Sequence, residues 1–172
     1  MAALSPRLRV ADTSRLSELA RRLSQAGHHV GEATSWEDLA KFDLIIISEP
    51  AEYVPEAVQR LEPLVSSRQI VIHTAVELGA EPLIDLPALG IAMACFGDDF
   101  IVDTCDEISQ AVAEVLVAEM HGSVWAVSDE ERPDLARALK IAAEANALKL
   151  QALRSVSSEA ARNIVIRQLG GW

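Results

Sequence analysis

The chain has 172 residues, of which half are apolar and only 4% are aromatic. This length suits one domain, or one domain with an appended segment, and is enough to bury a core. The formal charge of −11 argues against a nucleic-acid partner, because nucleic-acid-binding proteins usually present a basic surface. No apolar run approaches the roughly 18 residues that span a bilayer, and the first residues lack a signal-peptide pattern. We therefore expect a cytoplasmic protein with no membrane partner, whose Cys95 and Cys105 are free thiols.

The first predicted unit is a strand over residues 8–11, a polar turn, and an amphipathic helix that ends near Gly27. Spacings of three and four predict that one face of the helix is buried, through Leu16, Leu19, Ala20 and Leu23. Gly27 suits the end of the helix, because glycine adopts a positive φ at little cost. A short strand over residues 28–33 follows. This order of elements is typical of the start of a nucleotide-binding α/β domain.

Strands and helices alternate through the middle of the chain. The sequence predicts strands over residues 43–48, 68–74, 90–96, 100–104 and 123–127, and helices over residues 35–41, 55–65 and 106–122. Within residues 43–48, Leu44 and three consecutive isoleucines form a continuous apolar run without alternation, which indicates a central parallel strand covered on both faces. The core-facing residues of the helix that Asp106 caps are predicted to be Ile108, Ala111, Val112, Val115 and Leu116.

From Ser128 onward the pattern becomes helical, with one long alanine-rich helix over residues 134–154 and a final helix opened by residues 157–159. The predicted fold class is α/β, a doubly wound, mainly parallel Rossmann-like sheet with a short C-terminal α-helical tail. The predicted domains are residues 1–127 and 128–172. The tail carries apolar side chains that need a cover, among them Ile164, Val165, Leu169 and Trp172. A two-fold partner is the simplest cover, so we expect a homodimer through the C-terminal helices.

Six short strings occur in a fixed order and cover most of residues 7–154: RLRV, AGHHV, FDLIIIS, QIVIHTAVELG, ALGIAMACFGDD and LARALKIAAEANALKLQAL. In this order they resemble the Rossmann-like proteins of the 6-phosphogluconate dehydrogenase-like superfamily. The resemblance is strongest to a bacterial branch that joins a Rossmann-like domain to a helical domain. It implies NAD or NADP bound across the carboxyl ends of the strands, and oxidation or reduction of a small hydroxy or keto acid. It also implies a catalytic lysine on the first helix of the C-terminal domain.

The loop after the first strand departs from the superfamily's pattern. Where GxGxxG would stand, residues 11–16 read ADTSRL. The missing glycines serve the tight turn, the approach of the phosphate and the packing of the helix, and the carboxylate of Asp12 would repel a pyrophosphate. In favour of phosphate binding, Thr13 and Ser14 carry hydroxyls, and the free N–H groups at a helix start attract anions.

Three further residues complete the predicted cofactor-binding set. Glu32 lies about twenty residues beyond the loop, where an acid binds a ribose hydroxyl, and it favours NAD over NADP. The alternative for Glu32 is a solvated surface acid. Ser48 and Thr74 each stand at the carboxyl end of a predicted buried strand, where the cleft of such a fold lies.

The predicted catalytic residues are His73 and Lys140. His73 ends a buried strand at the cleft edge, and its alternative is a buried histidine bonded to the backbone. Lys140 is the residue that the resemblance places near hydride transfer, and its apolar neighbours would lower its pKa toward neutrality. Its alternative is an ordinary pair with Glu144 on a solvated face. No metal site is predicted, because the acids at positions 98, 99, 103 and 106 suit turns and a helix cap.

Three functions stay open at this point. The first is a nicotinamide-linked oxidoreductase with NAD favoured as the cofactor. The second is a non-catalytic Rossmann-like module that binds a small molecule and has lost the dinucleotide. The third is an interaction subunit that acts through its helical tail.

Overall fold

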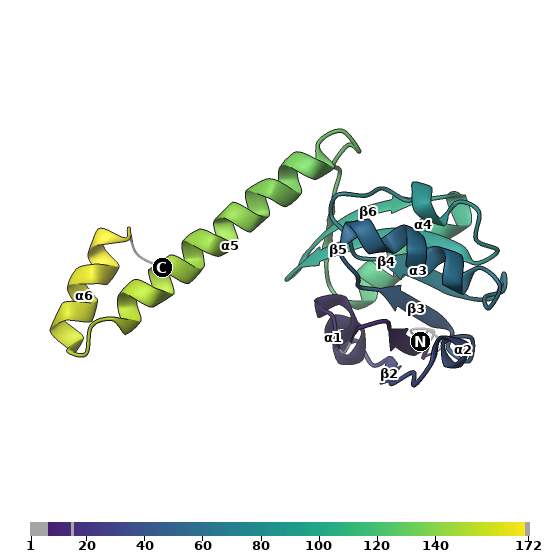
Figure 1. Ribbon diagram of the computed structural model, residues 1–172, viewed down its shortest axis with the longest axis horizontal. Coiled ribbons are helices and arrows are strands. Elements are labelled where there is room, and N and C mark those ends of the chain that lie inside the picture. Colours follow the sequence, from purple (N-terminus) through teal and green to yellow (C-terminus); the bar gives the residue numbers. More distant parts are fainter. Residues whose placement is uncertain (1–6, 15, 171–172) are drawn as a thin grey trace, which may run out of the picture. The chain divides into compact units, whose positions relative to one another are not determined.

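The computed structural model describes residues 7–14 and 16–170, and its central feature is a seven-stranded sheet in the order β2-β1-β3-β4-β5-β6-β7 (Figure 1). The strands are β1 (Arg9–Asp12), β2 (His29–Gly31), β3 (Leu44–Ile47), β4 (Ile70–His73), β5 (Leu89–Phe96), β6 (Asp99–Thr104) and β7 (Ser123–Trp125). Strands β1 to β5 are parallel, β6 is antiparallel to β5, and β7 is parallel to β6. The predicted α/β, mainly parallel and doubly wound architecture is confirmed.

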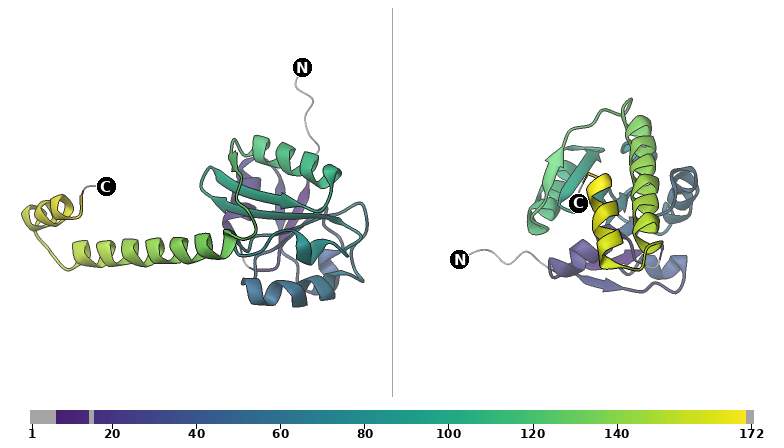
Figure 2. Two further views of the ribbon diagram at one scale, coloured as in Figure 1. Left: turned by 90° about the horizontal axis from the view of Figure 1, so that it is seen from above. Right: turned by 90° about the vertical axis from the view of Figure 1, so that its left-hand side faces the viewer.

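Helices cover both faces of the sheet. On one face lie α1 (Glu18–Gln25) and α4 (Glu107–Glu119), and on the other lie α2 (Trp36–Leu39) and α3 (Val54–Leu61). The opposite placement of α4 and α3 is visible in the left view of Figure 2. Short 3-10 turns, η1 (Ala51–Tyr53) and η2 (Glu81–Leu83), precede α3 and β5.

Strand β3 shows why the sheet needs two helical layers. All four of its residues are buried; Leu44 and Ile46 pack in the cluster under α1 and α4. The alternate residues Ile45 and Ile47 pack under α2 and α3, because successive side chains of a strand point to opposite faces. An apolar run without alternation therefore corresponds to a central strand, as predicted.

Helix α1 starts later than the sequence pattern suggests. Ser17 is its N-cap, and the Ser17 hydroxyl accepts a hydrogen bond from the N–H of Ala20. Leu16 therefore precedes the helix and is 58% exposed, so its predicted place on the buried face is wrong. The predicted role of Gly27 is confirmed, because it ends the helix with φ at +101°.

Helix α4 is rotated from the predicted orientation. Its buried residues are Ser109, Ala113, Leu116 and Val117, whereas Ile108 and Val115 are exposed. Only Leu116 of the predicted set is fully buried. The physical reason is the cap: Asp106 accepts hydrogen bonds from the N–H of Ser109 at 2.8 Å and from its hydroxyl at 3.1 Å. A serine satisfied in this way can face the sheet at little cost, which leaves the other apolar stripe outside.

The chain divides into two compact units, Met1–Pro133 and Asp134–Trp172. The second unit contains most of α5 (Arg132–Arg154) and all of α6 (Glu159–Gln168). Ser158 caps α6 as predicted, with its hydroxyl accepting from the N–H of Ala161. Gly170 follows α6 with φ at +81°, and Trp172, predicted as part of the apolar tail, lies outside the described residues. Within the described ranges, no helix has the length and apolar character needed to cross a membrane.

Candidate ligand-binding cleft

The strand order changes direction at β1. The chain leaves β1 for the outer strand β2 and then returns past β1 to form β3, so β1 has β2 on one side and β3 on the other. In open α/β sheets, ligands bind at the carboxyl ends of the strands beside such a reversal. Here that edge carries Asp12 at the end of β1, Ser48 after β3 and Glu32 after β2.

The carboxylate of Asp12 is the centre of the loop between β1 and α1. One oxygen accepts from the N–H of Ser14 at 3.0 Å, and the other accepts from the N–H of Ser17 at 2.8 Å. The hydroxyl of Ser48 also donates to Asp12, and its oxygen lies 2.7 Å from that of Ser14. Two backbone donors, one in the loop before α1 and one at its N-cap Ser17, are thus already bonded to a carboxylate of the chain itself.

Thr13 follows β1 and Thr74 follows β4, and both form hydrogen bonds to the carboxyl end of β3 or to the residue after it. The N–H of Thr13 donates to the carbonyl of Ile46 at 2.9 Å, and its hydroxyl accepts from the N–H of Ser48 at 3.2 Å. The N–H of Thr74 donates to the carbonyl of Ile47 at 3.1 Å. The structure therefore brings Asp12, Thr13, Ser14 and Ser48 together, and it places Thr74 one strand away at the end of β4.

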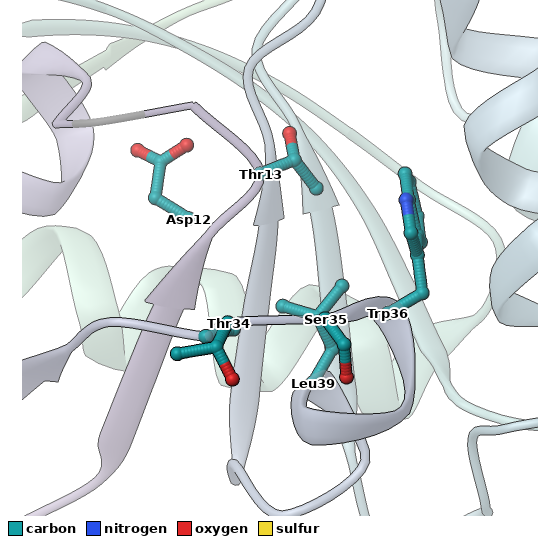
Figure 3. A pocket seen from close by; sticks show the side chains of 7 residues that line it. Asp12, Thr13, Thr34, Ser35, Trp36 and Leu39 are labelled. Atoms are coloured by element: carbon teal, nitrogen blue, oxygen red, sulfur yellow. The ribbon is translucent and has the colours of Figure 1, made fainter.

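Two hollows open beside the Asp12 loop. The larger, of about 560 Å³, is lined by Asp12, Thr13, Ser14, Val30, Gly31, Glu32 and Ala33. The smaller, of about 180 Å³, is lined by Asp12, Thr13, Ala33, Thr34, Ser35, Trp36 and Leu39. Figure 3 shows the smaller hollow, with Asp12 at the end of β1 and Thr13 directly after it. Thr34 and Ser35 lie on the connection from β2 into α2, and Trp36 and Leu39 lie in α2. Because the hollows share three residues, we treat them as one cleft and call it the β1–β2 cleft.

The β1–β2 cleft is polar and acidic. Asp12 and Glu32 contribute carboxylates, and hydroxyls come from threonine and serine residues. None of the described residues that line it is basic. The carboxylate of Asp38 holds the neighbouring wall by accepting from the Thr34 hydroxyl. The Lys41 ammonium and then the Thr34 hydroxyl lower the pKa of Asp38 to about 2, so this acid is ionised at neutral pH.

His73 lies in the interior, at the end of β4. It has no solvent exposure, and its Nε2 lies 2.7 Å from the carbonyl oxygen of Gly79. A carbonyl only accepts, so Nε2 carries the proton and Nδ1 is a buried atom without a hydrogen-bond partner. Burial lowers the pKa of His73 below its ordinary value. His73 is thus a neutral, buried histidine bonded to the backbone, which is the alternative to a catalytic role that the sequence left open. Its catalytic role stays a prediction.

Two residues that sequence reasoning missed hold the same loop. Arg132 is 1% exposed, and its Nη1 donates to the carbonyl of Leu78 at 3.2 Å. Asp103 accepts from the N–H of Ala80 at 2.6 Å. Together with His73 they bind three consecutive residues, 78–80, which we call the clamped loop. No pattern in the sequence indicates these contacts. The register of the sheet brings His73 and Asp103 near each other, because His73 pairs with Ala92 and Ala92 pairs with Asp103.

Lys140 belongs to the helical unit, where its side chain is exposed on α5. No ion pair joins it to Glu144 among the described residues, although Arg137 and Asp134 form such a pair one turn earlier, at 2.9 Å. The acids at positions 98, 99, 103 and 106 do not gather into a metal site. Indeed, no group of three or more potential ligands occurs in the part of the chain that the structure describes.

These features define a Rossmann-like unit of the kind found in NAD(P)-binding dehydrogenases. Solved structures with this fold include a pyrroline carboxylate reductase from Plasmodium falciparum with NADP bound, at a TM-score of 0.65 and 12% identity, covering 95% of this chain and 76% of that one. A putative NADP oxidoreductase from Bacteroides fragilis matches at a TM-score of 0.61 and 13% identity, over 95% and 73% of the two chains. An arogenate dehydrogenase from Synechocystis matches at a TM-score of 0.57 and 12% identity, over 94% and 74%.

At these identities the similarity establishes the fold. The predicted resemblance to Rossmann-like dehydrogenases is therefore confirmed as a likeness of fold, and the superfamily stays a prediction. No protein-family model matches the chain, and no curated protein is significantly similar to it in sequence.

Proposed function

We propose that this chain is a Rossmann-like protein that binds a small molecule in the β1–β2 cleft and does not transfer hydride. One observation carries the proposal: a cleft is formed at the strand reversal, but the backbone donors beside it are bonded to Asp12. The residues of the loop therefore do not fit a pyrophosphate, although the cleft has room for a small ligand. The acidic and hydroxyl-rich lining suits a ligand that offers hydroxyl or amino groups.

The test is calorimetric titration of the full chain with NADH, NADPH and the nucleoside adenosine, combined with a variant that fills the cleft. Ala33 lines both hollows, so Ala33→Phe should abolish binding of any cleft ligand. Ala118→Phe is the matched control, because Ala118 is exposed on α4 and lines neither hollow. We expect adenosine to bind the native chain and the control but not Ala33→Phe. Micromolar binding of NADH, or adenosine binding that survives Ala33→Phe, would contradict the proposal.

The position of Glu32 favours a second candidate function, an NAD-dependent oxidoreductase of a small hydroxy or keto acid. Glu32 directly follows β2 and lines the larger hollow, where an acid suits a ribose 2′-hydroxyl. The similarity to a reductase solved with NADP supports a nicotinamide dinucleotide, without favouring NAD. If NADH binds, Lys140→Ala should abolish turnover and leave the affinity for NADH nearly intact. Unchanged turnover would remove Lys140 from the site.

We also propose that the protein is a homodimer formed through its C-terminal helices. Ile141 and Leu148, seven residues apart on α5, are 59% and 65% exposed, and Ile164 on α6 is 62% exposed. An exposed apolar stripe of this kind is buried most simply against its own copy. Sedimentation equilibrium should give twice the mass of the 18.6 kDa chain, and a monomer at working concentration would refute the dimer.

A further inference from the structure

We propose that Asp12 is a built-in occupant of the anion site of this Rossmann-like unit, so that the β1–β2 cleft selects a neutral nucleoside over its phosphorylated forms. The inference rests on the proposed binding of a small molecule in that cleft. It adds the chemical class of the ligand and the residue that excludes the competing class.

The first step concerns the hydrogen-bond donors. In a Rossmann-like unit, anions bind to N–H groups at the start of the first helix, where the helix dipole also favours negative charge. Here the N–H of the N-cap Ser17 donates to the carboxylate of Asp12 at 2.8 Å, and the N–H of Ser14, in the loop before the helix, donates to it at 3.0 Å. The hydroxyl of Ser48 is bonded to the same carboxylate. A phosphate would have to displace a group of like charge that is covalently attached to the loop.

The second step concerns why the carboxylate stays there. Asp12 is the last residue of β1 and pairs with Ile46 of the central strand β3. Its neighbour Ala11 is fully buried, so the backbone that carries the carboxylate is anchored in the sheet. A displaced carboxylate would therefore lose two backbone donors and a hydroxyl, and the anchored strand could not move to give it new partners.

The third step concerns the ligand that remains acceptable. Glu32 can accept hydrogen bonds from a vicinal diol, and the hydroxyl of Thr13 is free to donate because its oxygen already accepts from Ser48. Val30 lines the larger hollow, and Leu39 and Trp36 line the smaller one, which gives apolar surface for a flat ring. A hydroxylated sugar joined to an aromatic base matches this combination of acceptor, donor and apolar wall.

The experiment compares adenosine, adenosine 5′-monophosphate and NAD by calorimetry on the native chain and on three variants. Asp12→Gly removes the carboxylate and frees both N–H groups, whereas Asp12→Asn keeps an acceptor and removes the charge. Glu18→Gln is the control, because Glu18 is an exposed acid in the first turn of the same helix that takes none of the loop donors. Arg15, which lies outside the described residues, is present in every variant, so any binding of phosphate through it is common to all of them.

We expect the native chain to bind adenosine at least about tenfold more tightly than the monophosphate. Asp12→Gly should bind the monophosphate and NAD at least about tenfold more tightly than the native chain does, with adenosine unchanged. Asp12→Asn should give a smaller gain in the same direction, and Glu18→Gln should change little because exposed charges contribute weakly.

Two results would overturn the inference while leaving the proposed function intact: native binding of the monophosphate as tight as that of adenosine, or no gain of phosphate ligands in either Asp12 variant. A gain of monophosphate binding in Asp12→Gly without any adenosine binding would retain the role of Asp12 in occupying the anion site and refute the proposed nucleoside ligand and function. If none of the three ligands binds any form of the protein, both proposals are wrong.

Discussion

The guanidinium of Arg132 donates from Nη1 to the carbonyl oxygen of Leu78 at 3.2 Å, which ties the first residue of α5 to the loop that follows β4. Its Nε also donates to Asp129 at 3.1 Å, and that carboxylate is mostly exposed. A nearly fully buried arginine thus has one exposed acidic partner and one backbone partner. Because taking a charge out of water is costly, these two hydrogen bonds offset part of the desolvation of the guanidinium.

We expect Arg132→Met to destabilise the protein by about 1–3 kcal/mol, because the carbonyl of Leu78 would lose its partner in the interior. Arg137→Met is the matched control, since Arg137 forms an ion pair with the same i,i+3 spacing but is exposed. The control should cost less than about 1 kcal/mol. Urea unfolding followed by tryptophan fluorescence measures both. Equal effects of the two substitutions would show that the buried bond to Leu78 contributes nothing.

His73 should make stability fall on acidification. Burial lowers its pKa in the folded chain below the ordinary value of 6.5, so the unfolded chain binds more protons as the pH drops below about 6.5. The contribution of neutral His73 is present above that pH and is lost as the pH falls toward the folded-state pKa.

Urea unfolding at steps between pH 8 and pH 5 tests this, with His73→Gln expected to show a flatter decline than the native chain. His29→Gln serves as the control, because His29 is exposed in β2. A native slope that persists in His73→Gln would rule out His73 as its source.

The two thiols should be unreactive in the folded protein. Burial raises the pKa of Cys95 to about 11, and burial together with Asp106 and Asp103 raises the pKa of Cys105. The thiolate is the reactive form, so Cys95 at neutral pH should react roughly 100-fold more slowly than an unperturbed thiol. Labelling with a thiol reagent, with and without urea, measures the ratio. Cys105→Ser isolates Cys95, and equal rates in the folded and unfolded chains would contradict the expectation.

Gly122 should not tolerate a side chain. A Cβ atom there would overlap the ring of Phe100, which is fully buried, and would lie 3.1 Å from Val117. Gly122→Ala should therefore cost about 1–3 kcal/mol by overpacking. In the background Phe100→Leu the same change should cost less, because the smaller side chain leaves room. Double-mutant analysis by thermal unfolding would show additive effects if the overlap were absent.

Apolar runs and helix-capping residues, which are patterns of a few neighbouring residues, predicted the buried strand β3 and the starts of several helices. The apolar run of β3 and the cap Asp106 occupy their expected roles, and the helices expected from residue 35 and from residues 157–159 begin at the caps Ser35 and Ser158. The rotation of α4 was not predictable from periodicity, because the helix has two apolar stripes and the bonds from Ser109 to Asp106 decide which one faces the sheet.

The candidate site was predictable only in part. Asp12, Ser48 and Glu32 each stand at or just after the end of a strand. Because the carboxyl ends of parallel strands meet at one edge of the sheet, the sequence predicted that these residues lie at the same edge. What the carboxylate of Asp12 does could not be read from the residue type, because an aspartate after a strand can repel an anion, cap a helix or bind a metal. The contacts that hold the clamped loop span as many as 54 positions in sequence, as for Arg132 and Leu78, and no local pattern records them.

The clamped loop also decides where the chain can be lengthened. Each of residues 78–80 is held by a side chain from a different part of the sequence, and a Cβ at Gly79 would lie 2.6 Å from Asp129 and 2.8 Å from Asp103. One inserted residue would put at least two of these three bonds out of register. The hairpin between β5 and β6 is the opposite case, because Gly97 has φ at +64° and nothing lies within 4 Å of an added Cβ. A peptide tag or a reporter domain inserted at Gly97 should therefore leave the sheet and the cleft undisturbed, whereas the same insertion at Gly79 should not.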